Sequence, residues 1–317
     1  IGGAWLLPKE SRMDCVVVVR EEAGSPSLDI VEFRRLKRGD IVVLGRTEDG
    51  LEGIFVNSRA FVPKESGQRR ADAFAFRAGR SRETAYSRDY DELRELLRYE
   101  REHGNIAWVL GPAVAFDYDS RVAMTALIER GYVHTLLAGN ALATHDLEAA
   151  LLKTALGQDI YTQKNRLNGH YNHLDLLNTA RGHGSLEKLI GNEKIEDGIV
   201  RAALKKGVPL VLAGSIRDDG PLPGVIADVY AAQDAMRNAA REATTVVALA
   251  TQLHTIAFGN LTPSYAVRDG RLRPVYFYSV DVSEFAVNKL RDRGTLSAIP
   301  IVANVQDFLV RLENNLD

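Results

Sequence analysis

The stretch Val133-His134-Thr135-Leu136-Leu137-Ala138-Gly139-Asn140 decides the fold class, because it joins a short apolar run to a glycine and then to a helical stretch over 144–156. A short apolar run followed by a turn and a helix is typical of a buried strand in a parallel sheet. The same pattern recurs along the chain. Strand-like runs lie at Ile106–Leu110, Val133–Ala138, Val208–Ala213, Thr245–Ala250, Val275–Val280 and Ile299–Ala303, and helical stretches lie at 119–130, 144–156, 194–206, 224–240, 283–293 and 305–316. This alternation predicts an α/β fold, with a mostly parallel sheet and helices on both faces.

The sequence before this region has a different pattern of apolar residues and turns. A charged helical pattern starts near Asp89 and ends at Gly104, whereas the preceding part has glycine-rich turns and no long helical pattern. Its short β-like runs lie at Cys15–Val19, Ile41–Leu44 and Gly53–Val56. The polar and basic stretch Gly67–Arg82 is typical of a linker or loop. We therefore expect a small β-rich domain over residues 1–82 and an α/β domain over residues 83–317.

The composition is that of an ordinary globular protein. Of 317 residues, 45% are apolar and 26% are charged, and 40 basic residues against 42 acidic ones give a formal net charge of −2. These values exclude a disordered chain and disfavour binding to nucleic acid or to a membrane surface. Cys15 is the only cysteine, so neither an intramolecular disulfide nor a cysteine-built zinc site can form. No signal-peptide pattern opens the sequence, and a reducing, cytoplasmic location is expected.

Ligands of open α/β sheets bind beyond the carboxyl ends of the strands, so the residues that follow each run are candidate site residues. Gly139-Asn140-Ala141 follows the second run, Thr251-Gln252-Leu253-His254 the fourth, and Asn304-Val305 the sixth. Asp281 ends the fifth run, just before a helical stretch. Its carboxylate is suited to accept hydrogen bonds from an adenosine ribose, which would favour NAD over NADP. The alternative is that Asp281 caps the following helix.

Four histidines bear on function. His145 lies at the expected start of a helix, where it either caps that helix or serves as an oriented acid or base beside a cofactor. His254 opens a helix directly after a strand, where a neutral imidazole could contact a cofactor. His170 and His173 lie three residues apart, but no carboxylate or cysteine completes a helical ligand pair, so no metal is expected.

Three consecutive charged residues open the loop Arg217-Asp218-Asp219-Gly220-Pro221-Leu222-Pro223. Arg217 can clamp a carboxylate with two hydrogen bonds, and Asp218 and Asp219 can bind an ammonium group or exchange protons. The alternative is an exposed Asp-Gly turn. Cys15 is either a buried strand cysteine that packs as a small hydrophobe or, if its strand packs against the cofactor cleft, a catalytic thiol.

Several long and unusual motifs lie along residues 13 to 310. They are Met13-Asp14-Cys15, Gly111-Pro112-Ala113-Val114, Ala138–Asp146, Gly169-His170 with Asn172-His173-Leu174, Val211–Pro223, Ala232–Arg237, Leu253-His254 with Gly259-Asn260-Leu261, and Asp292-Arg293-Gly294. In these stretches the chain resembles the archaeal-type ornithine cyclodeaminase family. This family is also known as the conserved domain of the bifunctional lysine-oxoglutarate reductase/saccharopine dehydrogenase, and it includes the C-terminal half of the cyanobacterial arginine dihydrolase/ornithine cyclodeaminase.

The resemblance implies a deoxyhypusine-synthase-like NAD-binding domain of Rossmann type, tightly held NAD, and conversion of L-ornithine to L-proline and ammonia. The sequence contains no Gly-x-Gly-x-x-Gly fingerprint, so the dinucleotide must be held in another way. Carried over residue by residue, the resemblance implies NAD contacts at Asn140, Ala141, Asp219, Thr251, Leu253, His254, Asp281, Asn304 and Val305. The chain departs from the family pattern at Tyr171, Thr255, Phe258 and Asn304 and in an insertion at Ala266–Pro274. These departures bear on which amino acid binds.

A cyclodeaminase of this kind borrows a hydride from Cα of a basic amino acid and returns it after ring closure. The candidates for proton transfer are Asp218, Cys15 and His145, with Arg217 or a basic residue of the small domain on the substrate carboxylate. The expected partners are a small basic amino acid and further copies of the chain in a homo-oligomer. Two other functions stay open: an NAD-dependent amino-acid or opine dehydrogenase, which would release NADH, and a non-catalytic NAD-binding sensor.

Overall fold

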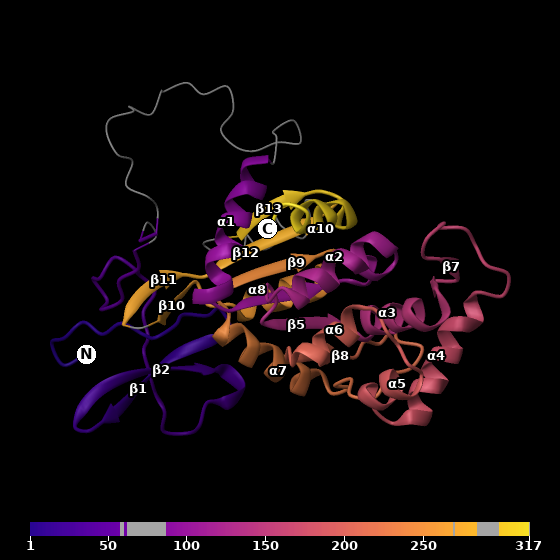
Figure 1. Ribbon diagram of the computed structural model, residues 1–317. Coiled ribbons are helices and arrows are strands. Elements are labelled where there is room, and N and C mark those ends of the chain that lie inside the picture. Colours follow the sequence, from indigo (N-terminus) through magenta and orange to yellow (C-terminus); the bar gives the residue numbers. More distant parts are fainter. Residues whose placement is uncertain (58–59, 62–86, 269, 284–297, 317) are drawn as a thin grey trace. The chain divides into compact units, whose positions relative to one another are not determined.

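The computed structural model describes residues 1–57, 60–61, 87–268, 270–283 and 298–316 (Figure 1). The chain divides into two compact units. One comprises Ile1–Tyr86 with Pro263–Val275, and the other comprises Ser87–Thr262 with Tyr276–Asp317. The expected linker at Gly67–Arg82 lies outside the described residues, as does the expected helix at 283–293 beyond its first residue.

The first unit contains a three-stranded antiparallel sheet in the order β2-β1-β3. Its strands are β1 (Cys15–Glu22), β2 (Ser25–Glu32) and β3 (Ile41–Val42), and a single-turn helix, η1 (Phe33–Arg35), follows β2. Ala23 and Gly24 form a two-residue hairpin turn, with φ angles of 51° and 79°. Two successive positive φ angles are typical of a type I′ turn, whose twist matches that of the paired strands.

The predicted strand at Gly53–Val56 is wrong. Gly50 and Gly53 adopt positive φ angles of 94° and 82°, so the chain turns back on itself there. Only an isolated bridge between Asp49 and Phe55 remains of the expected strand. A second hairpin, β10 (Tyr265–Arg268) with β11 (Arg271–Pro274), completes this unit and coincides with the insertion noted in the sequence.

The second unit is built on a six-stranded sheet in which all pairings are parallel. The strands are β4 (Ile106–Leu110), β5 (Thr135–Gly139), β8 (Leu210–Ala213), β9 (Thr245–Leu249), β12 (Tyr276–Asp281) and β13 (Ala298–Val302). The expected α/β sheet is therefore confirmed, and each strand lies within two residues of its predicted bounds. The central strand β4 is fully buried, which explains its unbroken apolar sequence.

Helices cover both faces of this sheet (Figure 1). They are α1 (Ser87–His103), α2 (Tyr118–Glu129), α3 (Asn140–Leu152), α4 (His170–His183), α5 (Leu186–Asn192), α6 (Ile199–Lys206), α7 (Val229–Glu242), α8 (Gln252–Leu261) and α10 (Val305–Glu313), with the short helix η2 (Pro112–Ala115) and the small hairpin β6 (Thr154–Ala155) and β7 (Gln158–Asp159). Met236 of α7 and Phe258 of α8 pack in one core with Ala107 and Val109 of β4. Helix α2 packs against α6 and α10. The sequence does not predict α4 and α5.

The strand order β13-β12-β9-β4-β5-β8 has a functional consequence. From β4 the chain moves outward through β5 to β8, and then returns to the other side of β4 to form β9, β12 and β13. This is the 3-2-1-4-5-6 order of the Rossmann fold, which binds ligands where the connections diverge. That switch point lies at the carboxyl ends of β4 and β9. Within the described part of the chain, no helix is long and apolar enough to cross a membrane.

Candidate functional site

The ends of β4 and β9 are held together by a glycine. The backbone N–H of Gly111 donates to the carbonyl of Leu249 at 2.7 Å. A Cβ on Gly111 would lie 1.9 Å from the carbonyl oxygen of Ala250, which itself adopts a φ of 48°. Only glycine fits at this contact, because the backbone carbonyl of Ala250 occupies the place that a side chain would need.

His254 lies at the same edge of the sheet, in the first turn of α8. A Cβ on Gly139, at the end of β5, would lie 3.0 Å from His254 Cε1, so the ring packs against that strand end. The Nδ1 atom of His254 lies 3.4 Å from the hydroxyl of Thr251. Burial lowers the pKa of His254 below its ordinary value, against the opposing influence of the Asp218 carboxylate. The lowered pKa favours the neutral imidazole, and the contact of His254 with a cofactor stays a prediction.

Helix α3 starts at Asn140 rather than at 144, which corrects one alternative from the sequence. Gly139 is the N-cap, with extended backbone angles, and Asn140 is the first helical residue. His145 therefore lies inside the helix and does not cap it. Ala141 lies beside Asn140 in the first turn, half-buried.

The Asn140 side chain holds the acidic loop. Its amide nitrogen donates to the carbonyl of Gly220 at 3.1 Å, and its amide oxygen accepts from the N–H of Leu222 at 2.9 Å. Asn140 is only 3% exposed. Both polar ends of this buried amide are thus satisfied by the loop, which fixes the loop above the end of β5.

The loop places its three charged residues differently. Arg217 is exposed, and its backbone N–H donates to the hydroxyl of Ser215. The Asp218 carboxylate accepts the N–H of Ser215 at 2.8 Å and influences His254. Asp219 extends away, and its carboxylate lies 3.4 Å from His173 Nε2 on α4. The structure therefore separates the two adjacent carboxylates, which is consistent with different roles for them.

His145 belongs to a buried cluster. Its Nδ1 lies 3.2 Å from the Oε2 atom of Glu148, one turn further along α3, and His173 Nδ1 lies 3.7 Å from the same oxygen. The other carboxylate oxygen, Oε1, accepts from the Thr154 hydroxyl at 2.7 Å. One potential metal-ligating atom from each of His145, Glu148 and His173 lies within 4.8 Å of the other two. Among the described residues, this group has the geometry to hold a metal ion. The expectation of no metal stays a prediction.

In this cluster, Glu148 and His173 each shift the pKa of the other toward its charged form. Burial raises the pKa of Glu148, but the hydrogen bonds from His145 and Thr154, together with the nearby His173, outweigh it and hold that pKa below its ordinary value. Glu148 raises the pKa of His173 above its ordinary value, with a further contribution from Asp219, although burial opposes the shift. Sequence reasoning missed Glu148. The spacing of His145 and Glu148, three residues apart on one helix, was the available signal.

The other predicted contacts follow the remaining strands. Asp281 ends β12, is half-buried and accepts the N–H of Ser283 at 2.9 Å. Asn304 is the N-cap of α10, and its side chain accepts two backbone N–H groups of the first turn. Val305 is buried.

The predicted contacts at α8 lie in its first turn. Thr251 occupies the N-cap, while Gln252 and Leu253 are exposed in the first turn. Whether these residues bind a dinucleotide stays a prediction.

In the N-terminal unit, Cys15 begins β1. It is half-buried, and its thiol lies 3.2 Å from a carboxylate oxygen of Asp14. Nearby in the sequence, the guanidinium of Arg12 has no hydrogen-bond acceptor among the described residues and lies 3.6 Å from a carboxylate oxygen of Glu10. Its side chain is fully buried. Arg12 is therefore a basic residue of the small unit with unused hydrogen-bonding capacity.

Two departures from the family pattern have different surroundings. Phe258 is fully buried in the core beneath α8, so it cannot touch a substrate. Tyr171 is 54% exposed and its ring lies 4.2 Å from that of His170. Of these two, Tyr171 alone is accessible to a ligand.

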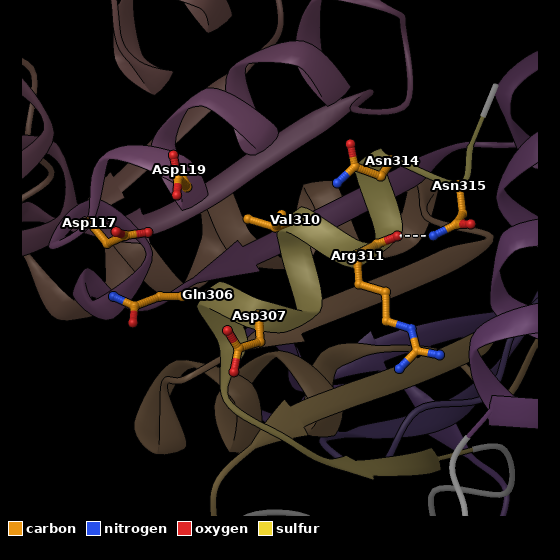
Figure 2. Close-up of a pocket in the computed structure, with 8 residues that line it drawn as sticks. All are labelled: Asp117, Asp119, Gln306, Asp307, Val310, Arg311, Asn314 and Asn315. Atoms are coloured by element: carbon orange, nitrogen blue, oxygen red, sulfur yellow. Dashed lines mark hydrogen bonds between the residues drawn. The ribbon is translucent and has the colours of Figure 1, made fainter. Parts of the chain in front are cut away.

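A cavity of about 510 Å³ lies between α2 and α10 (Figure 2). Three carboxylates line it, those of Asp117, Asp119 and Asp307, with Arg311 as its cation. Asp117 caps α2 by accepting the N–H of Ser120. Because these negative charges would repel a dinucleotide phosphate, the cavity does not suit such a ligand.

Together, the Rossmann strand order and the polar residues at its switch point define a protein of the Rossmann-type α/β class. Comparison with known proteins gives the family. Residues 91–312 match the family model described as arginine dihydrolase ArgZ-like, C-terminal, Rossmann fold. The chain belongs to this family, together with the archaeal ornithine cyclodeaminases, and the resemblance found in the sequence is confirmed.

Several relatives match over the whole chain. An ornithine cyclodeaminase of Archaeoglobus fulgidus is 40% identical over 97% of this chain and 70% of its own length. One of Methanococcus maripaludis is 34% identical over 100% of this chain and 73% of its own. The crystal structure of a conserved LOR/SDH protein from Methanococcus maripaludis has a TM-score of 0.85 at 35% identity, and covers 100% of this chain and 90% of that one. The ternary complex of AgrE with ornithine and NAD⁺ has a TM-score of 0.66 at 30% identity, over 100% of this chain and 42% of that one.

Proposed function

We propose that this protein is an NAD-dependent ornithine cyclodeaminase that converts L-ornithine to L-proline and ammonia. The observation that carries the proposal is the arrangement at the switch point, where Asn140 fixes the acidic loop beside the buried His254. The relatives named ornithine cyclodeaminase support this activity, and a relative solved with ornithine and NAD⁺ supports the cofactor and the substrate class. A cytoplasmic location and a homo-oligomer are part of the proposal.

The chain's own residues fit a dinucleotide. Asp281 ends β12 with a half-buried carboxylate, which can accept hydrogen bonds from ribose hydroxyls. We assign the adenosine ribose to Asp281 and the remaining contacts to Asn140, Ala141, Asp219, Thr251, Gln252, Leu253, His254, Asn304 and Val305. NAD, when bound, supplies a hydride acceptor and later a hydride donor for Cα of the substrate.

The protein must bind the amino acid folded, exclude water and move protons. The side-chain amine has to lose a proton before it attacks the Cα carbon of the oxidised substrate, and the α-nitrogen has to gain one before it leaves as ammonia. We assign proton transfer to Asp218, His145 or Cys15. The substrate carboxylate is assigned to Arg217 or to a basic residue of the small unit.

The test uses ornithine labelled with deuterium at Cα, the whole protein and NAD in unlabelled water. We expect proline that retains deuterium at Cα, one ammonia per proline and no accumulation of NADH. A keto acid with one NADH per turnover would instead identify an amino-acid dehydrogenase. NAD binding without consumption of ornithine, lysine or arginine would indicate a sensor. Mass spectrometry of the product and absorbance at the NADH band separate these outcomes.

A further inference from the structure

The buried cluster around Glu148 contains ionisable and hydrogen-bonding groups to which the proposed function assigns no role. Glu148 is fully buried in α3, yet its carboxylate has three neighbours with donor groups: His145 in the same helix, His173 in α4 and Thr154 in β6. The Thr154 hydroxyl accepts in turn from the side-chain amide of Asn172 at 2.9 Å. The Thr154 proton is thereby directed to Glu148. A buried carboxylate supported in this way is ionised.

An ionised carboxylate can only accept hydrogen bonds, so it dictates where the proton of an imidazole bonded to it lies. Each histidine turns its Nδ1 toward the same oxygen of Glu148, at 3.2 Å for His145 and 3.7 Å for His173. At 3.2 Å the His145 Nδ1 donates to the carboxylate and therefore carries a hydrogen, whereas His173 Nδ1 lies beyond hydrogen-bond distance and interacts with it through charge. On His173 the second nitrogen, Nε2, lies 3.4 Å from the carboxylate of Asp219, so the ring lies between two carboxylates, and both raise its pKa.

His145 differs from His173 in this respect. Among the described residues, its ring contacts are with Phe116, edge to face at 5.3 Å, and with the His173 ring at 5.1 Å, and neither supplies a carboxylate to Nε2. With Nδ1 protonated and no second anion, neutral His145 keeps a lone pair on Nε2. A carboxylate behind the imidazole also stabilises the imidazolium that forms when Nε2 takes a proton.

We propose that Glu148 is a positioning residue that fixes the Nδ1–H tautomer of His145, which makes His145 Nε2 the group that carries a proton from one nitrogen of the substrate to the other. The proton-carrying step rests on the proposed function. An N–H bond of the side-chain ammonium breaks as an Nε2–H bond forms, and the freed amine attacks the Cα carbon of the oxidised substrate, so that a ring C–N bond forms while the C=N electron pair moves onto the α-nitrogen. The Nε2–H bond then breaks to protonate the α-nitrogen, the ring nitrogen loses its extra proton to a second base, and its lone pair forms the ring C=N bond as the bond from Cα to the α-nitrogen breaks and ammonia leaves. No net proton is consumed by His145.

The contact between His173 and Asp219 connects the cluster around Glu148 to the acidic loop. The Asp219 side chain is 69% exposed, whereas Glu148 is buried, so His173 links an interior charge to the loop that Asn140 holds. In this arrangement His173 is a second positioning residue, which keeps Asp219 oriented.

The first experiment reads the tautomers directly and needs no turnover. Nitrogen NMR of the whole protein labelled at histidine should show His145 as the Nδ1–H tautomer and a His173 that titrates above the ordinary histidine value. In the Glu148→Gln variant, His145 should lose its tautomer preference and His173 should lose its proton at lower pH than in the wild type. A wild-type His145 found as the Nε2–H tautomer would overturn the proposal without any variant.

The second experiment measures turnover with saturating NAD and ornithine. We expect Glu148→Gln to lower kcat by about 100-fold and to displace the acidic limb of the pH profile, with the affinity for NAD unchanged. Thr154→Val, which removes one bond to the carboxylate, should give a smaller loss. The control is Glu187→Gln on α5, an exposed glutamate outside the cluster, which should match the wild type.

The outcomes separate this inference from the proposed function. If the wild type makes no proline, the proposed function fails while the NMR still decides the tautomer. If the wild type is active and Glu148→Gln keeps its kcat and pH profile, the inference fails. A metal ion bound one per chain in the purified wild type and lost in Glu148→Gln would also overturn it, because the Nδ1 atom of His145 would then be a ligand rather than a donor.

Discussion

Asp281 is the last residue of β12, and its carboxylate accepts one backbone N–H, that of Ser283. If it also binds the ribose hydroxyls of NAD, Asp281→Ala should weaken NAD binding by roughly 2–4 kcal/mol and reduce the preference for NAD over NADP, because two hydrogen bonds to a charged acceptor are lost. Isothermal titration with both cofactors measures this. Asp281→Asn separates the two interpretations, since asparagine keeps the bond to Ser283 but not the charge. NAD binding equal to wild type in both variants would leave Asp281 as a cap only.

Asp218 and Asp219 are adjacent but face different partners, His254 and His173. We expect Asp219→Asn to lower the affinity for NAD, and Asp218→Asn to leave NAD bound while reducing turnover. Asp218→Asn should also lower the pKa of His254 further, since the Asp218 charge favours the imidazolium. Equilibrium titration, steady-state rates and NMR of His254 check the three points. Equal loss of NAD binding in both variants, with turnover restored at saturating NAD, would contradict separate roles.

At the scale of elements, Gly111 fixes how β4 meets β9. Gly111→Ala places a methyl group against the carbonyl of Ala250, so a backbone shift is required. We expect a loss of about 3 kcal/mol or more in the free energy of unfolding, together with weaker NAD binding. Gly191→Ala in α5 is the matched control, because nothing lies within 4 Å of the added Cβ. This control should stabilise the protein by about 0.5–1 kcal/mol. Urea unfolding of both variants makes the comparison, and similar losses in the two would exclude a special role for Gly111.

The predictability of an element depended on how much of it is buried. The six parallel strands were predicted because their cores are apolar and unbroken, as in the fully buried β4. Helix α4 was missed because only Leu176, Leu177 and Ala180 of its residues are buried, so its apolar periodicity is weak. Strand β2 was missed for a similar reason: Pro26 is allowed on this edge strand, but it conceals the pattern.

At the scale of the whole molecule, the sequence indicated which strand ends to examine but not which side chains meet there. The segment Pro263–Val275 belongs with the N-terminal residues, a long-range association that periodicity cannot reveal. The cluster around Glu148 requires α4 to lie beside α3, and α4 was not predicted. Asn140 was identified as a cofactor contact from the family resemblance, whereas its hold on the loop at Gly220 and Leu222 emerged only from the fold.

The stability of the protein should depend on pH through Glu148 and His173. The pKa of Glu148 is lowered in the folded state, so its contribution is present above the ordinary value of 4.5 and is lost as the pH falls through the folded value. The pKa of His173 is raised, so its contribution is present below the ordinary value of 6.5 and is lost as the pH rises through the folded value. Both contributions therefore operate together between about pH 4.5 and 6.5.

Within that window the wild type should exceed Glu148→Gln in free energy of unfolding by roughly 1–3 kcal/mol, since bonds between charged partners are replaced by neutral ones. The difference should shrink as the pH rises above the folded pKa of His173, because the histidine loses its charge and the carboxylate loses a cation. Urea unfolding of the NAD-free protein at pH 5.5 and pH 9 measures the two limits. Glu187→Gln should show no such pH dependence. A difference between wild type and Glu148→Gln that is constant across this range would mean that Glu148 contributes through packing rather than through the charge of His173.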